Sequence, residues 1–267
     1  MRRLENRKIR IILIFVLFTF ICVLSSLYLS LNYYPGLNSQ EPLINNFNCP
    51  MISYLNPNID TISNSHESSK DNWTCLAGKV LKSGPYGNKN SSVKIAYLIG
   101  VHPAEQSSHQ AIYNAILKNQ ANLKYCYYIY KIQVNCSKDY NKNRYYGQLL
   151  AYKYAISDIN KNKFNMVVDV HSNQGKYAEK TFVFTAIPNN ESLLIAHFLV
   201  KHLPGLSYYI PSRTNEPTSA PYISEPLIKN GTPTIVYETY RYEPVNITEK
   251  KANDFIIALD DYKFDDK

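Results

Sequence analysis

Two histidines and two glutamates have the residue types and the spacing of a metal-dependent catalytic site. His102 and Glu105 form an H-x-x-E segment, and His171 and Glu238 follow later in the chain. Two imidazole nitrogens and one carboxylate are a normal ligand set for catalytic zinc, with the fourth position left to water. The pattern therefore predicts a zinc ion on His102, Glu105 and His171. Glu238 would then be the general base that takes a proton from this water and returns it to the leaving amine.

The positions of these residues predict that their side chains meet. His102 comes directly after the apolar, β-forming run 93–101, and His171 comes directly after the run 164–170. Glu238 ends a third run of this kind. In α/β proteins the ligand site lies at the carboxyl ends of the parallel strands. One histidine at a strand end is more often structural, but four candidate groups on one predicted edge favour a site.

The remaining four histidines are not expected to bind the metal. His109 lies on the far side of a predicted helical turn and is expected to pack inside the protein or to face solvent. His66 falls in a polar segment, and His197 and His202 fall on a predicted helix. The candidate imidazole ligands are therefore the two at strand ends.

The second half of the chain alternates between strand-like and helix-like patterns. Strands are predicted at 93–101, 126–135, 164–170, 180–187 and 232–239, and helices at 103–120, 148–158, 190–203 and 248–262. The polar segment SKDYNKNRYYGQ before the second helix is predicted to be a loop. Such alternation is typical of one α/β domain, here residues 93–267, with three α/β/α layers and a largely parallel mixed central sheet.

The N-terminus has the pattern of a membrane anchor. Residues 1–10 carry five Lys/Arg and one Glu, and residues 11–31 contain no charged residue. The apolar stretch is long enough to cross a bilayer as a helix, with the basic tail in the cytoplasm and the rest of the chain outside the cell. A cleavable signal peptide is the alternative, although no A-x-A-like site follows. Both interpretations place the domain outside the cytoplasm.

Residues 32–92 are rich in Asn, Ser, Pro and Gly and predict an extracellular stalk and an irregular segment leading to the domain. Four cysteines follow the anchor, and their pairing is open: Cys49, Cys75, Cys126 and Cys136. A bond between the last two is doubtful, because strand 126–135 would hold them about 33 Å apart. Six N-x-[ST] sequons agree with an external, glycosylated domain.

The charge of the chain gives no support for nucleic-acid binding. Half of the formal net charge of +8 lies in the first ten residues. No Lys/Arg cluster with interleaved aromatic residues follows, so nucleic acid is not an expected partner. The expected partners are a peptide substrate and the lipid bilayer, which the N-terminal helix would cross.

Several short motifs together resemble the zinc carboxypeptidase superfamily, which includes the metallocarboxypeptidases and the succinylglutamate desuccinylase/aspartoacylase deacylases. The motifs, in order, are Gly100-Val101-His102-Pro103-Ala104-Glu105, Asn143-Arg144, Asp169-Val170-His171-Ser172 and Tyr237-Glu238-Thr239. The resemblance implies the zinc ligands and the catalytic glutamate given above. It also implies that Asn143 and Arg144 receive a substrate carboxylate, which a guanidinium fork matches in bidentate fashion.

The chain departs from this family at two supporting positions. Where the family has an Asp that supports a zinc-bound histidine, this chain has Asn141, and Asp139 or Asp169 are alternatives for that role. The peptidases also have an arginine that stabilises the oxyanion, and none lies between the H-x-x-E segment and Arg144. Arg144 itself or the later Arg213 are the candidates.

Three functions are compatible with this sequence. The first is a membrane-anchored extracellular zinc metallopeptidase, which resembles a carboxypeptidase and cleaves an amide bond near a carboxylate of a peptide, such as a cell-wall peptide. The second is an N-acyl amino acid deacylase with the same zinc site, against which an extracellular location argues. The third is a non-enzymatic surface module on the same scaffold, which Asn141 and the missing arginine favour.

Overall fold

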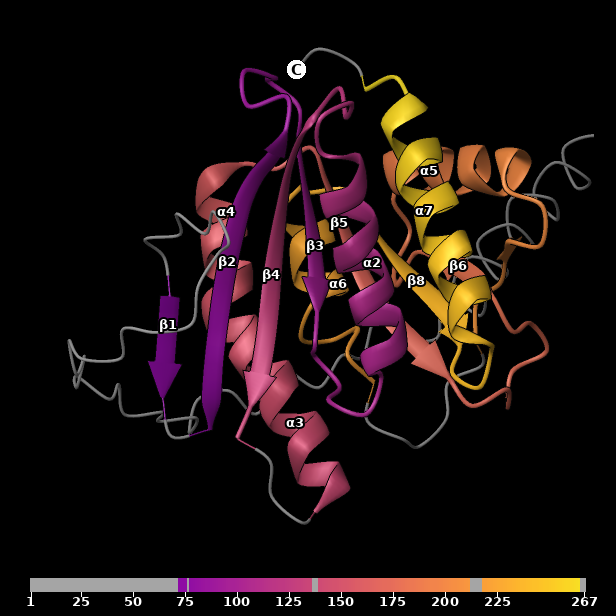
Figure 1. The fold of residues 1–267 in the computed structure, drawn as a ribbon. Helices are drawn as coiled ribbons and strands as arrows, with labels where there is room; N and C mark the ends of the chain where they lie inside the picture. The colour runs from indigo at the N-terminus through magenta and orange to yellow at the C-terminus, as the bar shows by residue number, and fades with distance from the viewer. Residues whose placement is uncertain (1–71, 76, 136–138, 212–217, 265–267) are drawn as a thin grey trace, which may run out of the picture. The chain divides into compact units, whose positions relative to one another are not determined.

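A computed structural model describes residues 72–75, 77–135, 139–211 and 218–264. In it the predicted apolar runs are strands of one mixed β-sheet (Figure 1). Eight strands pair in the order β1-β2-β4-β3-β5-β8-β6-β7. They are β1 (Asn72–Cys75), β2 (Gly78–Gly87), β3 (Lys94–Ile99), β4 (Cys126–Val134), β5 (Met166–Asn173), β6 (Phe182–Phe184), β7 (Ser207–Tyr208) and β8 (Thr234–Tyr240).

The centre of the sheet is parallel and its outer pairings are mixed. Strands β4, β3, β5 and β8 run parallel to one another, whereas β2 pairs antiparallel with β4 and β6 pairs antiparallel with β8. The carboxyl ends of β3, β5 and β8 therefore lie side by side at one edge. The prediction of an α/β domain with a largely parallel mixed sheet is confirmed.

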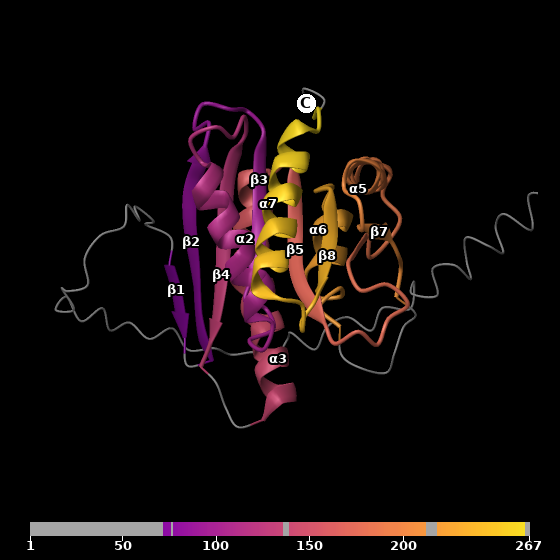
Figure 2. The same ribbon diagram turned by 45° about the vertical axis from the view of Figure 1, so that its right-hand side comes forward.

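Helices cover both faces of the sheet (Figure 2). One core contains side chains of α2 (Gln106–Asn119), α5 (Asn190–His202) and α7 (Val245–Asp261). A second core on the other face contains side chains of α3 (Tyr140–Leu150), the π-helix η1 (Ala151–Ile156), α4 (Ser157–Asn162) and α6 (Ser224–Lys229). The order of layers is helix, sheet, helix, as the sequence predicts.

Strand β3 shows why a central strand is apolar, since every position after Lys94 is buried. Its side chains alternate between the two faces, so that Tyr97 and Ile99 belong to one core and Ala96 and Leu98 belong to the other. A strand that is buried on both faces has no position for a polar residue. Burial of each large side chain contributes about 1.5–3 kcal/mol to folding. Central strands are therefore uninterrupted apolar runs, which can be recognised in a sequence.

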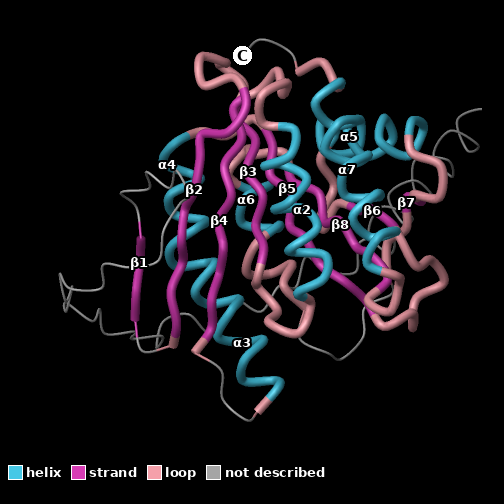
Figure 3. The backbone as a smooth tube through the Cα atoms, viewed as in Figure 1, coloured by secondary structure: helices cyan, strands magenta, loops and turns pink. Residues whose placement is uncertain are grey.

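Two segments differ from their predictions (Figure 3). Gly78–Gly87 forms strand β2, although residues 32–92 were predicted to be irregular; its Gly-Pro pair lies at a register shift between Ser83 and Tyr86, which hides the alternation. The predicted loop before residue 148 is helix α3, which begins after Asp139 because that side chain accepts the Lys142 backbone N–H at 3.1 Å. The predicted loop is wrong because the first turns of this helix are exposed and polar.

The predicted anchor at 11–31, residues 32–71 of the predicted stalk and entry segment, Cys49 and Cys136 lie outside the described residues. Within the described part of the chain, no helix combines the length and the apolar character that a bilayer crossing requires. Cys126 is a buried free thiol at the start of β4.

Candidate metal centre

The turn after β3 places two of the three predicted ligands. Gly100 ends the strand with a φ of 83°, and a Cβ here would meet the Ile132 carbonyl oxygen at 2.1 Å. Only glycine allows this departure from the sheet. His102 follows, and the backbone N–H of Glu105 donates to its carbonyl oxygen at 3.0 Å. Glu105 immediately precedes α2, so both side chains stay at the carboxyl end of β3.

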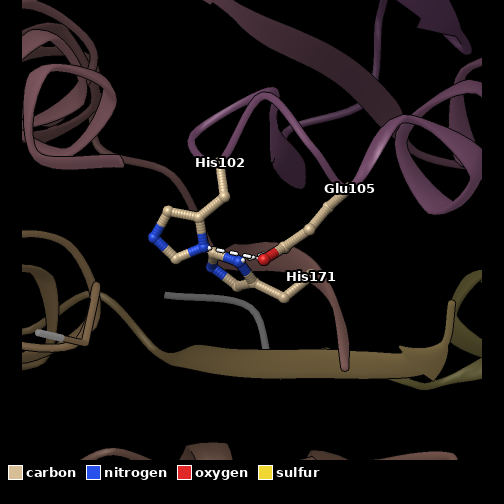
Figure 4. Close-up of side chains that lie close together, drawn as sticks. All are labelled: His102, Glu105 and His171. Carbon is tan, nitrogen blue, oxygen red and sulfur yellow. Dashed lines mark hydrogen bonds and ion pairs between the residues drawn. The ribbon is translucent and has the colours of Figure 1, made fainter. Parts of the chain in front are cut away.

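The third ligand, His171, comes from β5, the neighbouring strand (Figure 4). Glu105 lies between the two rings, with Oε1 at 3.1 Å from His102 Nδ1 and Oε2 at 2.9 Å from His171 Nδ1. One ligand atom from each of the three residues lies within 4.8 Å of the others, and all three side chains are buried. The structure thus brings the predicted ligand set together.

The charges of the three groups complement one another. Burial lowers the pKa of His102 to about 4, so this ring is neutral at pH 7. Burial alone would also lower the pKa of His171, but the Asp169 and Glu105 carboxylates raise it well above its usual value. Burial opposes ionisation of Glu105, yet the two histidines hold its pKa well below the usual range. An ionised carboxylate therefore lies between one neutral and one charged imidazole.

The outer nitrogen of His102 faces the side-chain amide of Gln148 on α3. The distance from Gln148 Nε2 to His102 Nε2 is 3.1 Å, and Gln148 Oε1 is buried with no hydrogen-bond partner among the described residues. Turning the amide by 180° would let Oε1 accept the Nε2–H of His102, and the Nδ1 lone pair would then be free for a metal. The orphaned oxygen is what a metal-binding tautomer of His102 requires.

The outer nitrogen of His171 lies beside two oxygens. Its Nε2 lies 2.9 Å from Asp169 Oδ1 and 3.0 Å from Ser219 Oγ. Ser219 also donates to Asp169 Oδ2 at 3.3 Å. A carboxylate behind a histidine fixes the ring and raises the basicity of its other nitrogen toward a metal. Both imidazoles therefore present Nδ1 to a common point, and the donor set fits zinc.

The two candidates for this supporting carboxylate have different places in the structure. Asp169 is fully buried behind His171, whereas Asp139 is the exposed cap of α3. Asn141 lies in the exposed first turn of the same helix. The carboxylate thus comes from the strand that carries the ligand, two residues earlier.

Arg144 approaches the centre from α3, where a loop was predicted. Its Nη1 donates to Glu105 Oε1 at 3.1 Å, and its guanidinium lies over the ring of Tyr140. The side chain is 21% exposed, so it lies at the rim of the centre. Asn143 precedes it in the same turn and is half-buried. The roles of Asn143 and Arg144 in binding a substrate carboxylate stay predictions.

Glu238 lies at the end of β8 and pairs in register with His171 of β5. Its Oε2 is 3.5 Å from Asn173 Nδ2. Burial raises the pKa of Glu238 to about 8, against the opposing charge of His171. The structure thus places this carboxyl group beside a ligand, and its role as the base stays a prediction.

Arg241 is a second arginine at the centre, and the sequence analysis missed it. It directly follows β8, and its Nη2 lies 3.8 Å from Glu105 Oε1. Its place three residues after Glu238, at the same strand end, was the available signal. Arg213, the arginine considered instead, lies outside the described residues.

His109 was predicted to pack inside the protein or to face solvent, and it packs inside. It is buried on α2, and its Nε2 lies 3.1 Å from the Val170 carbonyl oxygen of β5. Burial lowers its pKa to about 4. The ring therefore stays neutral at pH 7 and helps to fix α2 against the strand that carries His171.

Comparisons with known proteins give structural neighbours only. No family model and no curated protein matches the sequence. The chain is similar in structure to a metallo-carboxypeptidase from Burkholderia cenocepacia, with a TM-score of 0.48, 9% identity, and coverage of 68% of this chain and 60% of that chain. It is also similar to a succinylglutamate desuccinylase/aspartoacylase from Rhodobacter sphaeroides, with a TM-score of 0.46, 11% identity, and coverage of 70% of this chain and 58% of that chain. A third neighbour is the tripeptide-bound cell shape determinant Csd4 from Helicobacter pylori, with a TM-score of 0.45, 12% identity, and coverage of 68% of this chain and 54% of that chain.

Proposed function

We propose that this chain is a zinc-dependent amide hydrolase. The observation that carries the proposal is the convergence of His102, Glu105 and His171 on one point, with the outer nitrogen of each ring held by a further side chain. Such a shell leaves a coordination position for water. Zinc held there would polarise the carbonyl group of an amide and lower the pKa of that water.

Glu238 moves the proton in the proposed reaction. It takes a proton from the attacking water and returns it to the leaving nitrogen as the C–N bond breaks. A pKa of about 8 lies close enough to neutral pH for the group to work in both directions. The contact with Asn173 orients its carboxyl group.

Arg144 and Asn143 bind the substrate in the same proposal. The Arg144 guanidinium donates a hydrogen bond to the carboxylate of Glu105, a candidate metal ligand. A substrate carboxylate bound by Arg144 would therefore lie beside the metal. The bond that is cleaved would then be an amide close to a free carboxylate. A carboxypeptidase-like action on a peptide fits this arrangement.

The location of the protein is part of the proposal. The basic and apolar N-terminus supports a single-pass cell-membrane protein with residues 93–267 outside the cell as the catalytic domain. A tethered external hydrolase would meet wall peptides, and an N-acyl amino acid deacylase would not meet its mainly cytoplasmic substrates there.

The first test is metal content and turnover of the purified chain. We expect one zinc per chain at neutral pH and hydrolysis of members of a peptide panel, with less turnover of N-acyl amino acids. Glu238→Gln should keep the zinc and lose hydrolysis by about 10²–10⁴-fold. Glu249→Gln, an exposed carboxylate of α7, removes the same charge elsewhere and should change neither.

Each outcome of this test decides between the three functions. Zinc binding with unchanged turnover in Glu238→Gln would reject the proposed base. Preference for N-acyl amino acids would favour the deacylase, and the absence of stoichiometric zinc would favour a non-enzymatic surface module.

A further inference from the structure

The guanidinium of Arg241 presents one hydrogen-bonding edge to the metal centre. Its Nε is buried and has no hydrogen-bond partner among the described residues. Its Nη2, on the same edge of the group, lies 3.8 Å from Glu105 Oε1, which is too long for a hydrogen bond. A buried N–H donor that lacks an acceptor destabilises the folded protein. This edge therefore calls for an acceptor that the described side chains do not supply.

The position of Arg241 is fixed by the strands that carry the rest of the site. Its backbone N–H donates to the Asn173 carbonyl oxygen at 2.8 Å. The Asn173 side chain donates to the Thr239 carbonyl oxygen at 3.0 Å, so the end of β8 is tied to the end of β5. Glu238 and Arg241 thus have a set distance from His171, and a preorganised donor costs no rearrangement during a reaction.

The two arginines at the centre differ in what they already bind. Arg144 donates to Glu105 at 3.1 Å and comes from the rim of α3. Arg241 makes no side-chain hydrogen bond within the described residues and is 16% exposed, against 21% for Arg144. Arg144 suits an anion that arrives from solvent, and Arg241 suits a charge that develops inside the site.

We infer that Arg241 stabilises the oxyanion that forms when the amide carbonyl is attacked, an inference that rests on the hydrolytic function proposed above. No arginine lies between Glu105 and Arg144 in the sequence. The N–H groups of Nε and Nη2 lie on one edge of a permanently charged guanidinium, so both can donate to an oxygen anion placed against that edge. The residue is therefore a catalytic residue that touches the reacting oxygen.

The step balances without any further reactant. The water oxygen forms a bond to the carbonyl carbon, and the π pair of the C=O bond moves onto its oxygen. The water proton goes to Glu238, and Arg241 donates hydrogen bonds to the new oxyanion without transferring a proton. When the C=O bond reforms, the C–N bond breaks and the proton passes from Glu238 to the amine.

The inference can be tested without knowing the substrate. Methylphosphonate is a small tetrahedral anion that resembles the attacked carbonyl group. We expect the zinc-loaded wild-type chain to bind it, as measured by calorimetry, and Arg241→Gln to bind it at least about tenfold more weakly. Lys201→Gln removes the same charge from an exposed position on α5 and should leave binding unchanged. Zinc affinity, titrated separately, should not fall in any of these variants.

The outcomes separate this inference from the proposed function. A wild-type chain without zinc contradicts the function itself. A zinc-loaded wild type that binds no methylphosphonate, or an Arg241→Gln variant with zinc and wild-type affinity for it, overturns the role of Arg241. If Arg241→Gln does not fold, Arg241→Lys decides, because lysine keeps the charge and loses the two-donor edge. Weaker binding then supports the inference, and wild-type binding overturns it.

Turnover gives a second readout once a peptide from the panel is hydrolysed. Loss of an oxyanion donor lowers kcat by about 10²–10³-fold. Arg241→Gln should therefore lower kcat with little change in KM, and Arg144→Gln should mainly raise KM. Equal effects of both variants on KM alone would show that Arg241 only binds the ground state.

Discussion

The two imidazole ligands lie in regions of opposite electrostatic character. Around His102 the supporting partner is the neutral amide of Gln148, and burial lowers the pKa of the ring to about 4. Around His171 the partners are Asp169 and Ser219, and despite burial the pKa of the ring is raised well above its usual value. In the proposed zinc centre, one candidate ligand would thus be neutral before the metal binds, whereas the other would first lose a proton.

The proposed centre would therefore combine one imidazole that is neutral at pH 7 with one that is protonated until the metal binds. The neutral ring of His102, supported by an amide, can bind a metal without releasing a proton. A carboxylate-backed ring binds the metal more strongly once it is deprotonated, because the carboxylate raises its basicity. If the two regions differ in this way, substitutions around His171 should weaken zinc binding more than a substitution beside His102.

Glu105→Gln removes the carboxylate that both regions share, and it should have the largest effect. Stoichiometric zinc binding should be lost. In a chelator, the free energy of unfolding should fall by about 3–5 kcal/mol, because His171 and the two arginines lose their common partner. Metal analysis and urea unfolding measure both effects, with Glu249→Gln as the control. Retention of stoichiometric zinc would contradict the ligand assignment.

Asp169→Asn should weaken zinc binding by about 10–100-fold, because it removes the carboxylate behind His171. The substitution keeps the size of the side chain, so packing changes little. A competition titration with a chelating dye measures the affinity. Asp139→Asn, which changes only the exposed cap of α3, is the matched control. Equal effects of the two variants would show that the support comes from elsewhere.

Zinc affinity should depend on pH mainly through His171. Its raised pKa means that protons compete with the metal, so affinity should fall about tenfold for each pH unit below that pKa. His102, with a pKa of about 4, is already neutral at pH 6–8 and should add no dependence there. Calorimetry in buffers of different ionisation enthalpy should find about one proton released from these ligands. In Asp169→Asn this release should decrease, and no change in it would contradict the assignment.

Gln148→Leu should have the smallest effect of the four. It removes a neutral hydrogen bond to His102, which is worth about 0.5–1.5 kcal/mol, so zinc affinity should fall by about tenfold or less. The same dye competition measures it beside Asp169→Asn. A larger loss in Gln148→Leu than in Asp169→Asn would reverse the comparison between the two regions.

Much of the fold could be predicted because the central strands are buried on both faces. The runs that contain Tyr97, Val168 and Ile235 are apolar at nearly every position, and the alternation of strands and helices indicates a largely parallel sheet. Strand β2 escaped prediction because a register shift interrupts its pattern. Helix α3 escaped because its first turns face solvent, where no apolar periodicity is needed.

The candidate ligands could be recognised from the amino-acid sequence because His102 and Glu105 lie in the turn between an apolar run and a helix, and His171 lies near the end of a second apolar run. The polar groups that surround these three side chains could not be recognised before the elements were packed together. Gln148 reaches His102 because α3 packs across the sheet, and Ser219 and Arg241 reach the centre from elements distant in sequence. Strand ends are set by local composition, whereas the partners of a buried polar side chain depend on how separate elements pack.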